Sequence, residues 1–422
     1  MRAYQKKTAV DRTLFGFNSA VQLKLDAEEL IRLFQENVHS VGAEIGRIVA
    51  AKLLEDEVQQ LCGDHHERSE ARQGSRHGHQ RGTITIAGQK IRMEKPRVRH
   101  NGREHALRRY EVMQREDAMP EAVLARMIRG VSCRDYAGVI DLAHDGFGVR
   151  KSSVSRSFVD ASRVEVQQLI ERRFDGVRFP VIMIDGVDYA GTTMIVVLGI
   201  QNDGQKRILG FREGATENAE VCRMLLEELC ERGLCRDEPT LFVLDGSKAL
   251  RKAVIAIWGR FAIVQRCQLH KKRNVQAHVP ARHWDEVRRQ INDAYQQSDP
   301  NKALKRLKTT AAYLDRISPD AADSLREGME ETITVIRLGL PDELRRHVAS
   351  SNIIESSLAT TQKVSRNVKR WRDGTMRRRW CATGLLVAEK KFRRVKGHRH
   401  MPKLIAALDR IVNESASLSK IA

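Results

Sequence analysis

The segment Val181-Ile182-Met183-Ile184-Asp185-Gly186-Val187 decides the expected fold, because four apolar residues run directly into an aspartate and a glycine. Such a run predicts a buried strand whose end delivers a carboxylate to the edge of a sheet. The segment Leu241-Phe242-Val243-Leu244-Asp245-Gly246 repeats the pattern. In α/β proteins, ligands bind at the edge where the strands' carboxyl ends meet. The two segments therefore predict that Asp185 and Asp245 lie side by side at one sheet edge.

Two interpretations of this carboxylate pair remain open. Carboxylate oxygens suit Mg²⁺ or Mn²⁺, and a two-metal site supports in-line displacement at phosphorus. Alternatively, each Asp-Gly dipeptide simply turns the chain after a strand, which is a common role for these residues.

Composition limits the class of protein. The chain has 422 residues, which exceeds one core and allows two or three domains. Its formal charge of +20 favours a polyanionic partner, above all nucleic acid, over a ribosomal or membrane-surface role. Seven scattered cysteines do not form a disulfide framework, so a reducing cytoplasm is expected. No apolar run reaches the ~18 residues of a membrane helix, and no export signal is recognised.

The N-terminal third predicts a helix over residues 26–62, followed by a polar loop from Gly63 to Gly82. Thr83–Ile86 and Gln89–Met93 alternate apolar and polar residues and predict a β-hairpin. The loop suggests a zinc site, but its spacing matches no common zinc pattern, so bound zinc is not expected. The candidate ligands would be Cys62, His65, His66, His77 and His79.

Residues 120–160 resemble a helix-turn-helix: apolar-periodic helices, a glycine-containing turn and a Ser/Arg-rich helix that would enter the major groove. Serine and arginine donate hydrogen bonds to base edges and phosphates, which favours DNA binding over a plain helical bundle with a basic face. The expected DNA contacts are Arg150, Lys151, Ser153 and Arg156.

The central region orders its elements as three strands, then helix, strand, helix, strand and helix. Asn202-Asp203-Gly204 is a strong hairpin turn between the second and third strands. This order is that of a ribonuclease H-like α/β fold, in which the first and fourth strands are neighbours. That fold would bring Asp185 and Asp245 together.

Two further motifs follow. Cys267-Gln268-Leu269-His270 is half of a zinc site without a clear second pair, so a structural pair or a contact near the active site is favoured over bound metal. Asn352 with Glu355 three residues later fits a helix capping box. Glu355 would alternatively face a metal, but the spacing alone favours the cap.

The C-terminal part is strongly basic. Residues 363–399 hold 14 Lys or Arg against one Asp and one Glu, with Trp371 and Trp380 among them. Basic residues neutralise phosphates and indoles stack on splayed bases, which favours DNA binding over a solvated face. The expected contacts are Lys369, Arg370, Trp371 and Arg372.

From about residue 26 to 411, the chain resembles the mutator-type transposases of bacterial insertion sequences, members of the ribonuclease H-like, Asp-Asp-Glu superfamily. The most specific segments are Arg266–His270 with Arg273-Asn274-Val275, and Ser351-Asn352-Ile353-Ile354-Glu355. Asn367–Gly374 and Lys390–Gly397 add to the resemblance. The His-rich stretch at 65–79 departs from the family pattern.

The resemblance implies a catalytic and metal-binding triad of Asp185, Asp245 and Glu355, so Glu355 becomes a ligand as well as a cap. Cys267 and His270 match the family's Cys-x-x-His signature. Two Mg²⁺ (or Mn²⁺) ions per site would support nicking and strand transfer. Partners would be the element's terminal inverted repeats, target DNA and at least one further copy of the chain. The rivals are a non-catalytic DNA-binding regulator and a structure-selective nuclease of the same fold.

The expected organisation has five parts. Residues 1–115 form an N-terminal helical region with the His-rich loop and hairpin, and residues 116–175 form the helix-turn-helix region. Residues 176–282 form the first part of the ribonuclease H-like core. An all-helical insertion covers 283–346, and the last part of the core with basic helices covers 347–422.

Overall fold

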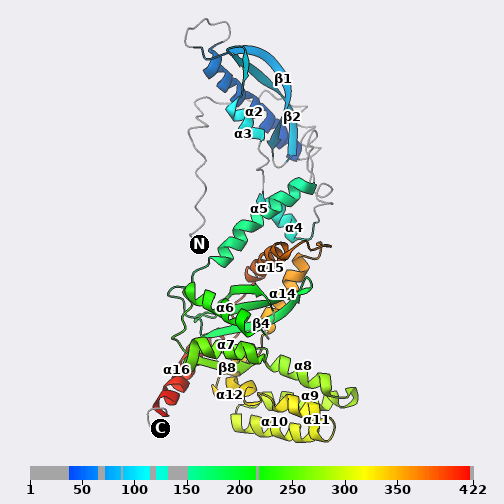
Figure 1. Ribbon diagram of the computed structural model, residues 1–422, viewed down its shortest axis with the longest axis vertical. Helices are drawn as coiled ribbons and strands as arrows, with labels where there is room; N and C mark the ends of the chain where they lie inside the picture. The colour runs from blue at the N-terminus through cyan, green and yellow to red at the C-terminus, as the bar shows by residue number, and fades with distance from the viewer. Residues whose placement is uncertain are drawn as a thin grey trace. The chain divides into compact units, whose positions relative to one another are not determined.

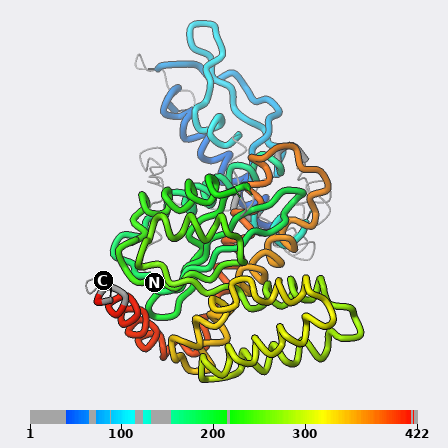
Figure 2. Tube along the Cα trace, turned by 60° about the horizontal axis from the view of Figure 1, so that its bottom comes forward, coloured from blue at the N-terminus to red at the C-terminus, as the bar shows by residue number. Residues whose placement is uncertain are grey.

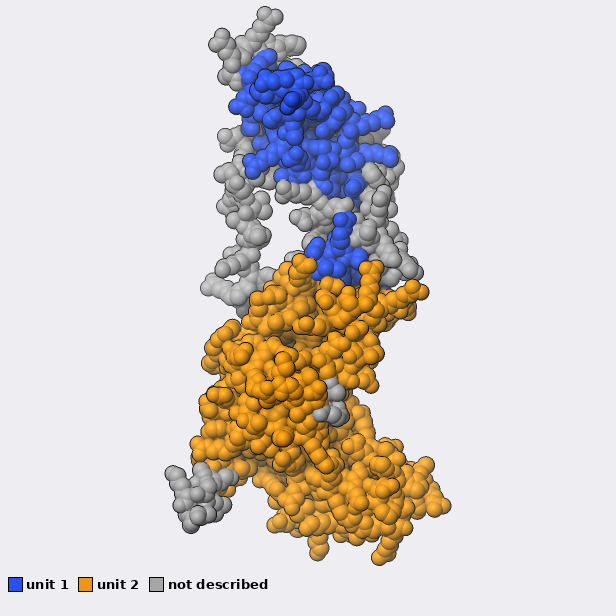
Figure 3. Space-filling model, viewed as in Figure 1, with its two compact units in different colours: residues 1–161 blue, residues 162–422 orange. Residues whose placement is uncertain are grey.

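The computed structural model describes residues 38–64, 72–86, 89–114, 120–131, 151–214 and 218–418. The chain divides into two compact units, residues 1–161 and 162–422, which Figure 3 colours separately. Within the described residues, every helix is too short or too polar to cross a lipid bilayer.

The first unit packs helices on a small antiparallel sheet of order β1-β2-β3. Its core joins α2 residues such as Leu54 and Val58 to strand residues such as Ile84 and Val98. The predicted hairpin is confirmed, with Ile86 paired to Gln89. The elements are α2 (Val38–Cys62), β1 (Ser75–Ile86), β2 (Gln89–His100), β3 (Arg103–His105), α3 (Arg108–Gln114) and α4 (Pro120–Ile128).

The expected polar loop from Gly63 to Gly82 is wrong in its second half, because β1 already begins at Ser75. Backbone pairing with β2 forms this strand, although its first residues are mostly exposed and polar. The first half of β1 therefore lacks hydrophobic alternation, and its backbone pairing with β2 makes it a strand instead. Residues 65–71 lie outside the described residues.

The proposed helix-turn-helix is described only at its ends. Helix α4 (Pro120–Ile128) agrees with the first predicted helix, and α5 (Lys151–Ile170) with the last. Residues 132–150, which would form the intervening helix and turn, lie outside the described residues.

The second unit is built on a five-stranded mixed sheet of order β6-β5-β4-β7-β8. Strands β4 and β8 of this sheet are labelled in Figure 1. The first three strands run antiparallel, and β7 and β8 are parallel to β4. The strand that carries Asp185, β4, is therefore central, and β4 and β7 are neighbours as expected. The strands are β4 (Val181–Tyr189), β5 (Thr192–Ile200), β6 (Lys206–Glu213), β7 (Thr240–Leu244) and β8 (Ala262–Arg266).

Helices cover both faces of this sheet. Because side chains alternate along a strand, Ile182 and Ile184 point to one face and Asp185 to the other. Ile182 and Ile184 share a core with α6 (Ala219–Glu231) and α7 (Lys248–Trp258), which includes an edge contact between Phe242 and Trp258 at 4.9 Å. On the side of Asp185, α14 (Asn352–Val364) contacts β4 and α15 (Gly374–Glu389) contacts β6.

A helical block follows the sheet, drawn in yellow in Figure 2. Helix α8 (Gln268–His278) leads from β8 into it, and prolines predicted to punctuate the region begin two of its helices. Helix α10 packs against both α9 and α11. The block comprises α9 (Ala281–Tyr295), α10 (Pro300–Asp315), α11 (Pro319–Arg326), α12 (Thr334–Arg337) and α13 (Asp342–Val348), and α16 (Met401–Leu418) ends the described chain.

Candidate active site

Asp185 lies within β4 rather than at its end, which corrects the sequence expectation. The strand continues to Tyr189 because β5 still pairs with it, whereas the parallel pairing with β7 ends at Ile184 and Leu244. Asp185 therefore sits where the sheet loses β7 as a neighbour. Its side chain is almost fully buried, and its Oδ2 atom has no hydrogen-bond partner. A buried oxygen without a partner is costly unless something else satisfies it.

The surroundings of Asp185 disfavour its charged form. Burial, with a smaller contribution from the charges of Asp245 and Glu355, raises the pKa of this carboxyl to about 6. His270 and Ser351 act in the opposite direction but do not outweigh burial. The carboxylate would therefore gain strongly from a nearby divalent cation.

Asp245 follows the last residue of β7, as predicted. Its Oδ1 atom accepts a hydrogen bond from the Ser247 N–H at 2.8 Å, while Gly246 adopts φ +112°. The turn interpretation of the Asp-Gly dipeptide is therefore confirmed at Asp245. The charge of Asp245 also reaches Asp185, but the metal interpretation stays a prediction.

Glu355 comes to the site from the first turn of α14. The predicted capping box is wrong: Ser351 occupies the N-cap position, its side chain caps nothing, and Asn352 is already helical. The Glu355 carboxylate instead accepts two hydrogen bonds from Arg273, at 2.6 and 3.1 Å. Tertiary contact with α8 has replaced the local contact that the spacing favoured.

Cys267 and His270 link these carboxylates. Cys267 is buried at the N-terminus of α8, where its sulfur accepts the Ser351 N–H at 3.4 Å. His270, one turn later, lies 4.0 Å from an Asp185 oxygen and 3.6 Å from a Glu355 oxygen. His270 therefore lies beside two of the predicted site carboxylates, and the role of the Cys267/His270 pair stays a prediction.

The ionisation of this pair follows from the same contacts. A hydrogen bond with Cys267, opposed by burial and aided by the charge of Asp185, raises the pKa of His270 to about 9. Burial would raise the pKa of Cys267, but hydrogen bonds with His270 and Ser351 outweigh it and lower that pKa. The imidazole is therefore cationic at neutral pH and neutralises part of the site's negative charge.

One group of side chains within the described residues could hold a metal ion. Asp185, His270 and Glu355 each offer a ligand atom, and these atoms all lie within 4.8 Å of one another. Two carboxylates suit Mg²⁺ or Mn²⁺, and an imidazole is more typical of transition metals. The unpaired Oδ2 of Asp185 fits this role.

Comparison with known proteins identifies the lineage. The family described as "Transposase, Mutator family" matches residues 19–375. The chain belongs to the Mutator family of transposases. It is 28% identical to the transposase for insertion sequence element ISRM5 of Rhizobium meliloti (strain 1021) over 74% of this chain and 78% of that protein. It is 25% identical to the transposase for IS256 in transposon Tn4001 of Staphylococcus aureus, over 79% and 87% of the two chains.

The basic segment of this Mutator-family chain is organised by an aromatic contact. The Trp371 indole is half-buried and meets the Tyr189 ring edge-on, at 5.5 Å between centroids. Lys369, Arg370 and Arg372 around it are exposed. Trp380 is buried within α15, so it cannot stack on bases as the sequence suggested. The position of Trp380 in a basic run predicts a contact with DNA, but in the fold this side chain packs in the interior.

The remaining predicted contacts are only partly described. Arg156 is exposed on α5, which begins at Lys151, and the side chains of Lys151 and Ser153 lie outside the described part of the chain. Arg150 lies outside the described residues. Of the candidate zinc ligands, Cys62 is buried in the core and His77 and His79 belong to β1.

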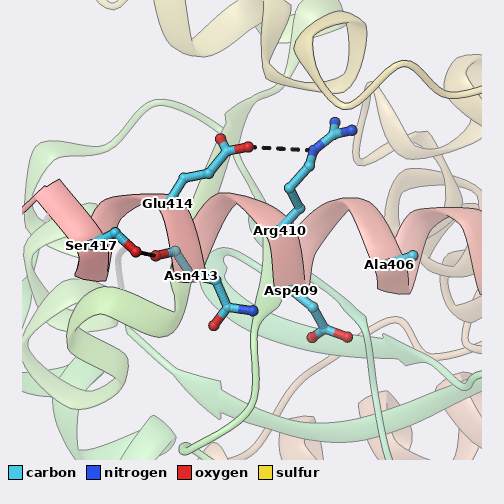
Figure 4. A pocket seen from close by; sticks show the side chains of 6 residues that line it. All are labelled: Ala406, Asp409, Arg410, Asn413, Glu414 and Ser417. Carbon is cyan, nitrogen blue, oxygen red and sulfur yellow. Dashed lines mark hydrogen bonds and ion pairs between the residues drawn. The ribbon is translucent and has the colours of Figure 1, made fainter.

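Sequence reasoning missed Arg273 as a partner of Glu355. The sequence feature that points to Arg273 is its position three residues after His270, because this spacing places both side chains on one face of α8. A hollow over α16 contains none of the site residues (Figure 4): it is lined by Asp409, Asn413 and their helical neighbours, with Arg410 3.9 Å from Glu414.

Proposed function

We propose that this chain is a metal-dependent DNA transposase that binds the ends of an insertion sequence, nicks them and transfers the cut strand to target DNA. The observation that carries the proposal is the convergence of Asp185 and Glu355 with His270, from a strand and two helices far apart in sequence. The family membership supports DNA as the substrate.

A ribonuclease H-like core is part of this proposal. The sheet order and the strand directions, with three antiparallel strands followed by two parallel ones, support it. In such a core, Asp185, Asp245 and Glu355 form the catalytic carboxylate set, and the helical block between Asp245 and Glu355 is an insertion.

Asp185, Asp245 and Glu355 would hold two Mg²⁺ or Mn²⁺ ions. Such ions, when bound, lower the pKa of a water or a DNA 3′-hydroxyl and stabilise the leaving oxygen. The chain's own residues supply a buried, poorly solvated carboxylate in Asp185 and an adjacent pair of cations in His270 and Arg273. These cations limit repulsion among the carboxylates before DNA and metal arrive.

DNA is held, in this proposal, by exposed cations around the site and by the helix-turn-helix region. Lys369, Arg370 and Arg372 are exposed close to Trp371, which contacts Tyr189 four residues beyond Asp185 on β4. Arg150, Lys151, Ser153 and Arg156 are the proposed contacts to the element ends. Bringing two ends together requires at least two copies of the chain.

The decisive test uses purified protein, Mg²⁺ and a duplex carrying the element's ends. The wild-type chain should nick the ends and join the new 3′-hydroxyls to a second duplex. Asp185→Asn, Asp245→Asn and Glu355→Gln should each lose both steps while still binding the ends. Nicking without joining would instead identify a nuclease, and a folded Glu355→Gln chain that joins strands normally would contradict the proposed triad.

A further inference from the structure

A basic hollow lies at the end of the sheet opposite the carboxylates. Its cations are Lys206 and Arg207, at the start of β6, and Lys390, Arg393 and Arg394, just after α15; we call these residues the hairpin cradle. The cavity has a volume of about 430 Å³ and also contains Gln205, Phe392 and Glu389.

The backbone holds this cradle in place. The Val395 N–H donates to the Gly204 carbonyl at 2.9 Å, which ties the segment after α15 to the β5–β6 turn. Gly204 has φ +84°, and a Cβ there would lie 2.4 Å from the Cβ of His398. The close approach of the two segments thus requires glycine at the turn.

The single carboxylate of the hollow is already satisfied. Glu389 accepts hydrogen bonds from both terminal nitrogens of Arg172, at 2.8 and 2.9 Å, and from the Ile208 N–H at 2.6 Å. Its side chain is only 12% exposed. Glu389 therefore orders the cradle and also lies 4.0 Å from Arg207, which leaves it little capacity to neutralise the remaining cations.

Two of the cations have no acidic partner within the described chain, namely Lys206 and Arg393. Lys206 is half-buried with its ammonium 5.7 Å from the Phe392 ring centre, and burial lowers its pKa. Arg394 pairs with Asp203 at the surface, at 3.3 Å, and such exposed pairs are weak, so this side chain can turn to a stronger anion. Lys390 is exposed and lies 3.2 Å from Glu165, whose side chain is only 21% exposed.

We propose that the hairpin cradle binds a backbone phosphate of duplex DNA, at a second contact separate from the catalytic carboxylates. The inference rests on the proposed function, because it takes DNA as the polyanion. Several converging cations with one occupied carboxylate suit a phosphate diester, which brings charge and acceptor oxygens but reads no sequence.

The sheet register sets the spacing between the two contacts. Lys206 pairs with Ile200, which pairs with Val181, and Asp185 lies further along the same strand. At strand dimensions, Lys206 and Asp185 are about 16 Å apart. That separation is comparable with the ~12 Å width of the DNA major groove. One duplex can therefore reach both, and the cradle would hold it while the scissile phosphate lies at the carboxylates.

The test measures DNA affinity of the full chain as a function of salt, on a duplex of random sequence and without divalent metal. Each phosphate contact that is lost should reduce the slope of log K against log salt by about 0.9. The double variant Lys206→Gln/Arg393→Gln loses this one contact, so its slope should fall by about 0.9 and its affinity at low salt by about tenfold or more. The double variant Lys206→Arg/Arg393→Lys keeps both charges and should restore the slope.

The matched control is Lys302→Gln/Lys305→Gln, which removes the same charge from exposed positions on α10. Its slope should stay near that of the wild type. An equal loss in both neutralised variants, or no loss in either, would overturn the cradle while leaving nicking and the proposed function intact. A wild-type chain that binds no duplex at all would contradict the proposed function itself. A cradle variant that changes only self-association of the chain would show that this surface contacts another protein copy and not DNA.

Discussion

The Nε2 atom of His270, on α8, lies 3.6 Å from a carboxylate oxygen of Glu355, on α14. The Nδ1 atom of the same ring lies 4.0 Å from Asp185 on β4. One imidazole thus lies between two carboxylates that the chain supplies from separate elements. The imidazolium consequently offsets part of the negative charge of these carboxylates, and a change to one member alters the others.

The carboxylate variants should affect chemistry and not folding. Asp185→Asn and Glu355→Gln keep shape but remove negative charge, and we expect strand nicking to fall by at least about 100-fold. Asp188→Asn is the control, because Asp188 is exposed on the opposite face of β4 and receives a 3.3 Å hydrogen bond from Thr193. Single-turnover nicking rates measure the difference between these variants. An equal loss of nicking in Asp188→Asn would contradict a specific catalytic role for Asp185.

Metal binding should depend on pH through Asp185. Its pKa is raised to about 6 in the folded chain, so the carboxyl is protonated at pH 5 and ionised at pH 7.5. Without metal, this group therefore destabilises the fold as pH rises from about 4 towards 6. Mn²⁺ should raise the melting temperature clearly at pH 7.5 and little at pH 5. Calorimetry with and without Mn²⁺ measures this, and an equal shift at both pH values would contradict the role of Asp185.

Lys271 gives a stability test away from the carboxylates. Its ammonium is fully buried and donates to the Ser324 carbonyl and, at 2.7 Å, to the Glu327 carbonyl. Lys271→Met removes the ammonium that donates to both carbonyls, although Arg266 still donates to the Glu327 carbonyl at 3.0 Å. The substitution should cost about 1–3 kcal/mol of unfolding free energy. Lys271→Arg, which keeps a donor, should cost less unless its larger head cannot fit.

The same residue predicts a pH dependence. Burial lowers the pKa of Lys271 to about 8, below its value in the unfolded chain. The unfolded state then binds more protons between pH 8 and about 10, so this group increases stability as pH rises through that window. Denaturant titrations across the window should show this increase in the wild type and its absence in Lys271→Met.

Cys267 and His270 should act without stoichiometric zinc. Cys267 is buried against Ser351, and the metal-competent group around His270 consists of carboxylates, not of a second Cys/His pair. Elemental analysis of the purified chain should therefore find well under one zinc per chain. One tightly held zinc that is lost on Cys267→Ser would contradict this prediction.

Trp371 should position the basic segment through Tyr189. Trp371→Phe preserves an aromatic contact and should retain most DNA binding, whereas Trp371→Ala removes the 5.5 Å ring contact and should weaken it. Limited proteolysis near Lys369 and Arg370 adds a second measurement. Unchanged cleavage of that segment in Trp371→Ala, together with lost DNA binding, would indicate direct stacking on a base instead.

The sequence alone determined the central sheet. Val181–Ile184 and Leu241–Leu244 are continuous apolar runs, and Asn202-Asp203-Gly204 marks a tight hairpin. Each signal lies within a few residues of the structure that it forms. The pairing of β4 with β7, and so the approach of Asp245 to Asp185, also followed from the order of elements.

Only the tertiary structure decided the role of the local motifs. Asn352 and Glu355 have capping-box spacing, yet Glu355 bonds Arg273 because α8 lies beside α14. Trp380 sits among basic residues, yet it is buried. The polar start of β1 carries no alternation, yet backbone pairing makes it a strand. In each case a contact between distant segments supplied more free energy than the local preference, and distant contacts are not encoded in short-range spacing.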